Sequence, residues 1–203
     1  MAVRILLTGF EPFGNDDYNP SAEAVERVSS IRGARIEKLI LPVVWGTAFE
    51  RMQTVWEDFS PDLVLMTGLA GGSDRIRIER VGINLCGAAK DSLGKYPNGS
   101  EDCAAERRIS ENGADAYFST YDEKSILNAL RSAGIPAGYS FSAGTYLCNY
   151  ILYSSLEKIS REKRTIKAGF LHVPYANGMR ENVPCLPIDI IVAALELALS
   201  NML

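Results

Sequence analysis

The chain has 203 residues, 47% of them hydrophobic and 23% charged, a composition that allows a substantial core and excludes a largely disordered protein. Its formal net charge of −4, without a dense run of lysine and arginine, argues against a nucleic-acid-binding surface. No apolar run approaches the roughly 20 residues that a membrane span requires, so we expect no membrane segment.

Cysteine and histidine content narrows the chemistry further. The four cysteines are widely spaced and form no CxxC pair, and the first residues are too short for a signal-peptide core. We therefore expect reduced thiols and a cytoplasmic protein. His172 is the only histidine, so zinc sites built from several histidines are excluded, and a mechanism that needs an imidazole must use this residue. We expect no metal site.

In chain order, residues 3–8 form a short apolar run that predicts a buried strand. The following loop carries Phe10 and Phe13 among turn-forming residues, and these rings either wall a binding site or pin the loop to the core. The next predicted elements are a helix over residues 20–30, a strand over 35–41, a helix over 46–59 and a strand over 63–67.

Residues 76–84 begin with alternating apolar and polar side chains, which is typical of a strand with two unlike faces. Glu79 and Arg80 lie within this run, where both fit an ordinary solvated face. Residues 85–114 are polar and contain glycine, proline and asparagine throughout, so we expect a long excursion in the form of a hairpin or an arm. A helix is predicted over residues 122–132.

A cysteine lies at the start of the next predicted helix. Residues 138–141 favour a strand, residues 142–145 favour a tight turn, and Thr145 is placed to cap the helix that follows. Cys148 then falls in the first helical turn, where unpaired N–H groups and the positive end of the macrodipole stabilise a thiolate. The same position also fits a small core residue, because free cysteines are commonly buried.

The last elements are a strand over residues 167–175, which ends at a proline, and an apolar helix over 187–202. His172 lies near the end of that strand, where α/β sheets present functional groups, although a lone histidine is more often a hydrogen-bonded core residue. Strands and helices alternate without a repeat or linker. The sequence therefore predicts one domain, residues 1–203, with an α/β fold, a largely parallel sheet and helices on both faces.

Three side chains from remote segments can be combined into a nucleophilic site. Cys148 supplies a thiolate, His172 a base, and Glu79 a carboxylate that orients the imidazole and supports its charge. The N–H groups at the start of the cysteine helix would form an oxyanion hole. This set predicts acyl transfer to cysteine followed by hydrolysis.

Several separate blocks of the sequence resemble one family in the family's own order. They are Gly9-Phe10-Glu11-Pro12-Phe13-Gly14 with Asn19-Pro20-Ser21, Gly68 to Gly72 with Glu79-Arg80-Val81 and Ile83-Asn84, Ser140 to Asn149, and Gly169 to Tyr175. Over nearly its whole length the chain resembles pyrrolidone-carboxylate peptidases (pyroglutamyl peptidase I), a family of cysteine peptidases.

This resemblance implies removal of N-terminal pyroglutamate from peptides, with Cys148 as nucleophile, His172 as base and Glu79 as the orienting group. It also implies a phosphorylase/hydrolase-like three-layer α/β/α sandwich with a mostly parallel, mixed sheet, no cofactor, and a homo-oligomer, either tetramer or dimer. Aromatic walls suit the flat, neutral ring of pyroglutamate because they bury both ring faces. The positions that match the family's substrate pocket are Phe10, Phe13, Asn19, Leu69, Tyr146 and Leu147.

The chain departs from the family at several positions. Leu69 replaces a glutamine credited with a polar contact to the substrate, and Ser73 and Ala89 replace arginines. Residues 176–178 also replace the usual Pro-Glu-Gln. A buried lactam that loses a hydrogen bond loses roughly 1–3 kcal/mol of binding free energy.

Two alternatives therefore stand beside a pyroglutamyl peptidase. One is a cysteine amidohydrolase that acts on a different small amide or lactam-capped substrate, which the Leu69 departure motivates. The other is a non-catalytic binding protein of the same fold.

Overall fold

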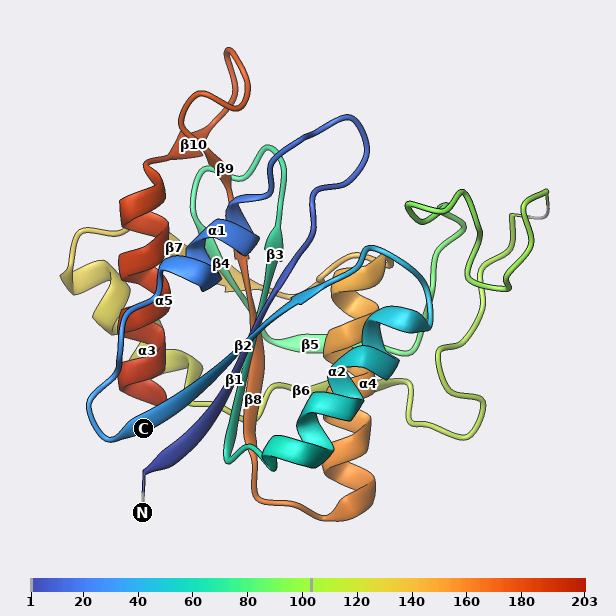
Figure 1. Cartoon of the computed structure of the whole chain (residues 1–203), viewed down its shortest axis with the longest axis horizontal. Helices are drawn as coiled ribbons and strands as arrows, with labels where there is room; N and C mark the ends of the chain where they lie inside the picture. The colour runs from blue at the N-terminus through green and yellow to red at the C-terminus, as the bar shows by residue number, and fades with distance from the viewer. Residues whose placement is uncertain (1, 103) are drawn as a thin grey trace.

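A six-stranded sheet forms the centre of the computed structural model, which describes residues 2–102 and 104–203 (Figure 1). Its strands are β1 (Val3–Phe10), β2 (Ala34–Leu41), β3 (Leu63–Leu69), β4 (Ile76–Glu79), β7 (Ala137–Ser140) and β8 (Lys167–Val173). Their order is β2-β1-β3-β8-β4-β7. All neighbours are parallel except β4 and β8, so β4 and β7 run opposite to the other four strands.

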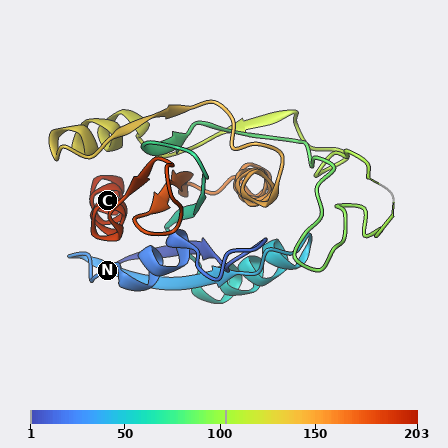
Figure 2. The same cartoon turned by 90° about the horizontal axis from the view of Figure 1, so that it is seen from above.

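Helices cover both faces of this sheet, as Figures 1 and 2 show. One face packs against α1 (Pro20–Arg27), α3 (Glu123–Ser132) and α5 (Ile188–Met202). The other face packs against α2 (Thr47–Phe59) and α4 (Leu147–Glu162). The predicted three-layer α/β/α sandwich with a mostly parallel, mixed sheet is confirmed.

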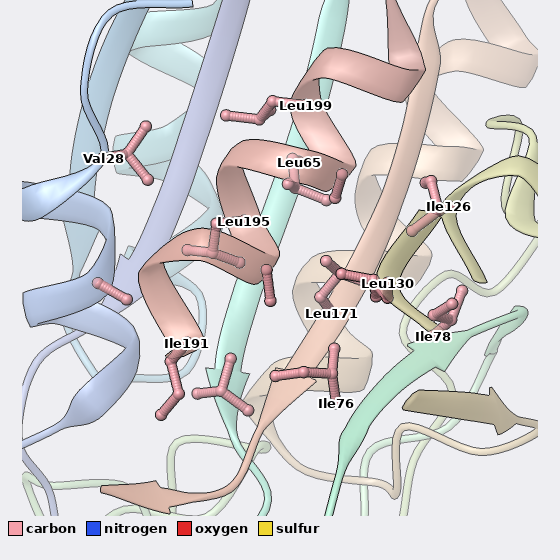
Figure 3. Close-up of a cluster of buried hydrophobic side chains, with 14 of the residues drawn as sticks. Val28, Leu65, Ile76, Ile78, Ile126, Leu130, Leu171, Ile191, Leu195 and Leu199 are labelled. Atoms are coloured by element: carbon pink, nitrogen blue, oxygen red, sulfur yellow. The ribbon is translucent and has the colours of Figure 1, made fainter. Parts of the chain in front are cut away.

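The pleat of the strands divides the core into two clusters. Leu65, Leu171 and Ile78 point toward α5 and α3, and Figure 3 shows them packed with Leu195 and other apolar side chains of that face. The residues next to them in the strands must point the other way, toward α2 and α4. Phe170, one residue before Leu171, is indeed buried in the cluster that packs against α2 and α4, which we call the α4 cluster. The candidate site described below lies on this face of the sheet, which we call the α4 face.

The strand predicted over residues 76–84 is two strands, because the chain changes partners at Arg80. The Arg80 N–H donates to the carbonyl of Ser140 at 2.9 Å, and its own carbonyl accepts from the N–H of Ser119 at 2.9 Å. Beyond it, β5 (Val81–Ile83) pairs antiparallel with β6 (Ala116–Phe118) in a separate two-stranded sheet. The first helix is also shorter than predicted, since it ends at Arg27.

Residues 85–102 and 104–114 form the expected excursion, which extends to one side of the sandwich (Figure 1). Cys86 and Arg107 form an isolated antiparallel bridge across it. A short parallel pair, β9 (Tyr175–Ala176) and β10 (Cys185–Leu186), precedes α5. None of the described helices has the length and apolar character needed to traverse a bilayer.

Candidate active site

A row of residues crosses the α4 face of the sheet from strand to strand. Gly68 of β3 pairs with His172 of β8, which in turn pairs with Arg77 of β4. Glu79 lies two residues after Arg77 and therefore projects from the same face of the sheet. Strand alternation alone thus brings an imidazole, a guanidinium and a carboxylate together under α4.

The imidazole of His172 is held from two sides. Its Nδ1 lies 2.8 Å from Glu79 Oε1, and its ring centroid lies 4.7 Å from that of Phe170. Glu79 is fully buried and His172 is 5% exposed. The backbone carbonyl of Glu79 accepts hydrogen bonds from the hydroxyls of Ser119 and Tyr121, so the carboxylate is anchored at its own main chain. The predicted pairing of His172 with Glu79 is present.

Cys148 is the second residue of α4, and its sulfur lies over the main chain of β3. A Cβ atom added to Gly68 would be 2.7 Å from Cys148 Sγ and 2.9 Å from the ring of Phe170. A side chain at position 68 would therefore occupy the space of the thiol. Because Gly68 and His172 are paired in adjacent strands, sulfur and imidazole are neighbours.

The charges of this group favour an imidazolium. Burial lowers the pKa of His172, but the charge and hydrogen bond of the Cys148 thiolate, together with those of Glu79, outweigh burial and raise the pKa to about 9. Near neutral pH the ring of His172 is therefore positively charged.

The start of α4 differs from the sequence prediction in its cap. Tyr146, not Thr145, occupies the N-cap position, and its side chain makes no capping hydrogen bond within the described chain. Thr145 instead uses its carbonyl oxygen to accept a hydrogen bond from the N–H of Gly87 at 2.7 Å. The N–H groups of the first turn thus lack a side-chain cap and can face an anion near Cys148.

Asn149, next to the cysteine, is a residue to which sequence reasoning assigned no role. It is fully buried, and its side chain accepts from the N–H of Ile83 at 2.9 Å and donates to the carbonyls of Ile83 and Leu85 at 2.9 and 3.0 Å. These three bonds fasten the first turn of α4 to β5. The signal available in the sequence was an amide side chain directly after a candidate nucleophile.

A small, mainly apolar cavity of about 140 Å³ opens onto the sulfur and the imidazole. This volume lies well below the roughly 300 Å³ at which pockets for drug-sized ligands begin, so the cavity suits a compact group. All six predicted substrate-binding residues line it, together with Val43 and Ala143, which the sequence did not single out. The lining residues are Phe10, Phe13, Asn19, Val43, Leu69, Ala143, Tyr146, Leu147, Cys148 and His172.

The side-chain amide of Asn19 forms hydrogen bonds to neighbouring groups of the protein. Its Oδ1 accepts from the N–H and hydroxyl of Ser21, at 3.0 and 2.8 Å, and its Nδ2 donates to the carbonyl of Glu11 at 3.0 Å. The Ser21 hydroxyl also accepts from the N–H of Phe10 at 3.1 Å. Asn19 thereby caps α1 and fixes the loop that carries the aromatic wall.

Phe10, the last residue of β1, and Phe13, in the loop that follows, combine both predicted roles. Phe10 is 3% exposed and belongs to the α4 cluster, whereas Phe13 is half-buried against it, yet both line the cavity. Of the departures from the family pattern, only Leu69 reaches the cavity. Ser73 bonds to the carbonyl of Arg75, and the carbonyl of Ala89 accepts from the indole of Trp45.

Comparison with known proteins extends over the whole chain. The family described as pyroglutamyl peptidase matches residues 3–203. A pyrrolidone-carboxylate peptidase of Yersinia pestis (strain Pestoides F) is 38% identical over 203 residues, covering 97% of this chain and 91% of that protein. The crystal structure of pyroglutamyl peptidase I from Bacillus amyloliquefaciens superposes with a TM-score of 0.91 at 34% identity, covering 100% of this chain and 96% of that one. The pyrrolidone carboxyl peptidase of Thermococcus litoralis gives 0.91 at 33% identity, with 98% and 93% covered.

Proposed function

The chain belongs to the pyroglutamyl peptidase family, and we propose that it removes N-terminal pyroglutamate from peptides with Cys148, His172 and Glu79 as its catalytic groups. One observation carries the assignment of residues: Cys148 Sγ lies over Gly68, beside the imidazole that pairs with Glu79, at the end of a compact apolar cavity. The relatives are named as pyrrolidone-carboxylate and pyroglutamyl peptidases, which supports this activity.

The chemistry follows from the positions of these groups. The thiolate attacks the carbonyl carbon that joins pyroglutamate to the next residue, not the carbonyl of the lactam ring. The N–H groups at the start of α4 stabilise the oxyanion that forms. The C–N bond breaks as the imidazolium gives its proton to the departing peptide amine, which leaves a thioester on Cys148. His172 then takes a proton from water, whose oxygen attacks the thioester. Free pyroglutamate leaves, and the thiolate and imidazolium are restored.

The cavity provides a physical reason for selecting a blocked N-terminus. A free amino group is charged, and it would lose its hydration in a site walled by Phe10, Phe13 and Leu69. The lactam of pyroglutamate is neutral and flat, so both of its faces can be covered by such walls. We infer that these residues, with Asn19, Tyr146 and Leu147, form the substrate pocket.

The function is tested with two arylamides that differ in one atom group. Pyroglutamyl-arylamide should release its amine rapidly, whereas prolyl-arylamide, which has the same ring size but a charged amine in place of the lactam, should not. Cys148→Ala should abolish turnover without changing the far-UV circular dichroism. Equal turnover of both arylamides, or full activity in Cys148→Ala, would refute the proposal.

We also propose that residues 1–203 act as a single catalytic domain that needs no cofactor. The two core clusters lie on the two faces of one sheet, which supports a single folding unit. Activity should therefore survive dialysis against a chelator.

A cytoplasmic location is supported by Cys86, Cys148 and Cys185, which are unpaired in the described chain. Thiol titration of the purified protein under denaturing conditions without reductant should find all cysteines free.

A homo-oligomer, tetramer or dimer, is the final part of the proposal. Phe118 and Phe141 are each 66% exposed, and the guanidinium of Arg80 lies 5.5 Å from the ring of Phe141. Exposed aromatic rings with an arginine are typical of protein interfaces. Light scattering after gel filtration should give a multiple of the 22.2 kDa chain mass. A monomer at micromolar concentration would reject this part alone.

A further inference from the structure

Arg77 lies beside the proposed catalytic groups but is not among them. It pairs with His172 across the β4-β8 ladder and precedes Glu79 by two residues, so all three side chains share one face of the sheet. Arg77 Nε lies 3.4 Å from Glu79 Oε1, the same oxygen that pairs with His172 Nδ1. The guanidinium and the imidazole therefore share one carboxylate oxygen.

The other end of the guanidinium reaches the segment that leads to the nucleophile. Its second terminal nitrogen donates to Ser140 Oγ at 2.7 Å and to the carbonyl oxygen of Ser142 at 2.9 Å. Ser140 ends β7, and Ser142 lies in the turn before α4. One side chain thus connects the carboxylate behind His172 with the turn that sets the start of the Cys148 helix.

Glu79 has few other means of balancing its charge. It is fully buried, and its Oε2 has no hydrogen-bond partner among the described residues. A buried carboxylate with an unpartnered oxygen is costly unless a positive charge lies nearby. Within the described chain, Arg77 and His172 are the two side chains that form ion pairs with it.

We propose that Arg77 is a positioning residue that compensates the charge of Glu79 and locks the turn before Cys148, so that sulfur, imidazole and carboxylate stay aligned. The inference rests on the proposed cysteine chemistry, and it extends that chemistry to a fourth residue. The side chain of Arg77 is 36% exposed, so solvent screens its electrostatic interaction with Glu79. Its hydrogen bonds to Ser140 and Ser142 therefore provide much of the positioning.

The positive charge of Arg77 also affects the protonation of the neighbouring groups in a defined direction. Within the described chain, Cys148 from α4 and Tyr121 from the segment before α3 also lie against Glu79 and His172, and the Arg80–Glu123 ion pair follows β4. Removing a nearby positive charge favours protonated forms, so loss of Arg77 should shift the pH profile of the site upward.

The experiment measures the rate at which iodoacetamide alkylates Cys148 as a function of pH, followed by peptide mapping. This readout needs no substrate, so it is independent of whether pyroglutamyl peptides are cleaved. Arg77→Gln should move the alkylation midpoint upward by about half a pH unit and lower kcat for pyroglutamyl-arylamide about tenfold or more. Arg77→Lys retains the charge but cannot reach all three acceptors, so its midpoint should stay while kcat falls.

Arg75→Gln is the matched control, because Arg75 is exposed and pairs with Asp74 outside the site; both quantities should remain at wild-type values. If Arg77→Gln matches Arg75→Gln in midpoint and kcat, the proposal is wrong. If Arg77→Gln does not fold, Arg77→Lys and Ser140→Ala decide, since wild-type kcat in both would overturn the positioning role. An absence of arylamide turnover in the wild type would reject the proposed function, whereas the alkylation profiles would still test Arg77.

Discussion

Glu79 shows how one residue sets the chemistry of its neighbour. Its charge and its 2.8 Å hydrogen bond are two of the causes that raise the pKa of His172 to about 9 against the opposing effect of burial. Glu79→Gln keeps the shape of the side chain and removes the charge. We expect kcat to fall roughly 10²- to 10⁴-fold, as for the equivalent change in serine peptidases.

The same change should alter the pH dependence. In the wild type the alkaline limb of kcat should fall near pH 9, where the imidazolium loses the proton that the leaving amine needs. Glu79→Gln should move that limb to lower pH. Glu123→Gln, which breaks an ion pair with Arg80 outside the cavity, is the control and should leave the limb in place. An unmoved limb in Glu79→Gln would show that Glu79 does not support the imidazolium.

Stability should follow the same titration with a defined sign. The pKa of His172 in the folded protein is raised above the unfolded value of 6.5. Its contribution to the free energy of unfolding is therefore complete below pH 6.5 and is lost as pH rises toward about 9.

Leu69 is the cavity residue at which the sequence departs from the family pattern described above. It lines the cavity with an apolar side chain where the family pattern has glutamine, so under the proposed function a lactam would have one fewer hydrogen-bond partner. Leu69→Gln should raise kcat/KM for pyroglutamyl-arylamide by roughly 5- to 100-fold, which corresponds to one recovered buried hydrogen bond. Leu69→Met fills similar space without a donor and should give no gain. Equal values for the two variants would mean that no amide is missing.

At the scale of secondary structure, β3 must pass directly beneath the nucleophile. Gly68 permits this contact, because a Cβ atom would be 2.7 Å from Cys148 Sγ. Gly68→Ala should displace the sulfur and lower kcat roughly 10²-fold while the fold is retained. Gly138→Ala is the matched control in β7, since its Cβ would meet only the flexible side chain of Arg75, at 3.3 Å. Similar losses in both variants would indicate a general strain of the sheet.

The start of α4 depends on Asn149 in the same way. The Asn149 side chain is buried and makes three hydrogen bonds to Ile83 and Leu85, so Asn149→Ala removes the bonds that the Ile83 N–H and the Leu85 carbonyl make to it. We expect a loss of roughly 2–4 kcal/mol in the free energy of unfolding by urea. Asn201→Ala, which removes a bond within α5 to Leu197, should cost under about 1 kcal/mol. A comparable cost for both would remove the anchoring role of Asn149.

Local patterns predicted these elements well where the period was clear. The alternation of apolar and polar side chains in Ile76-Arg77-Ile78-Glu79 identified a strand with two faces. Glycines and a proline marked the ends of the strands beside it. The break at Arg80 was not predictable, because it depends on hydrogen bonds to Ser140 and Ser119, which are far away in the sequence. The capping prediction for Thr145 failed for a similar reason, since Gly87 binds its carbonyl.

On the scale of the whole molecule, the excursion of residues 85–114 returns to the site rather than standing apart from it. The carbonyl of Lys90 accepts from the hydroxyl of Tyr146 at 2.9 Å, and the carbonyl of Ala89 accepts from the indole of Trp45 at 3.0 Å. One wall of the cavity is therefore held by a segment whose described residues form no helix or strand. Composition and turn residues predicted the excursion, but nothing in its own pattern indicated this contact.

The convergence of three segments on one cavity is the central claim, and site-directed labelling tests it most directly. A chloromethyl ketone of pyroglutamate should alkylate the protein once, with all of the label on the peptide that contains Cys148, and the prolyl analogue should react far more slowly. Pyroglutamyl amide should protect against labelling. Label on Cys86 or Cys185, or equal rates for the two ketones, would contradict the assignment of nucleophile and pocket.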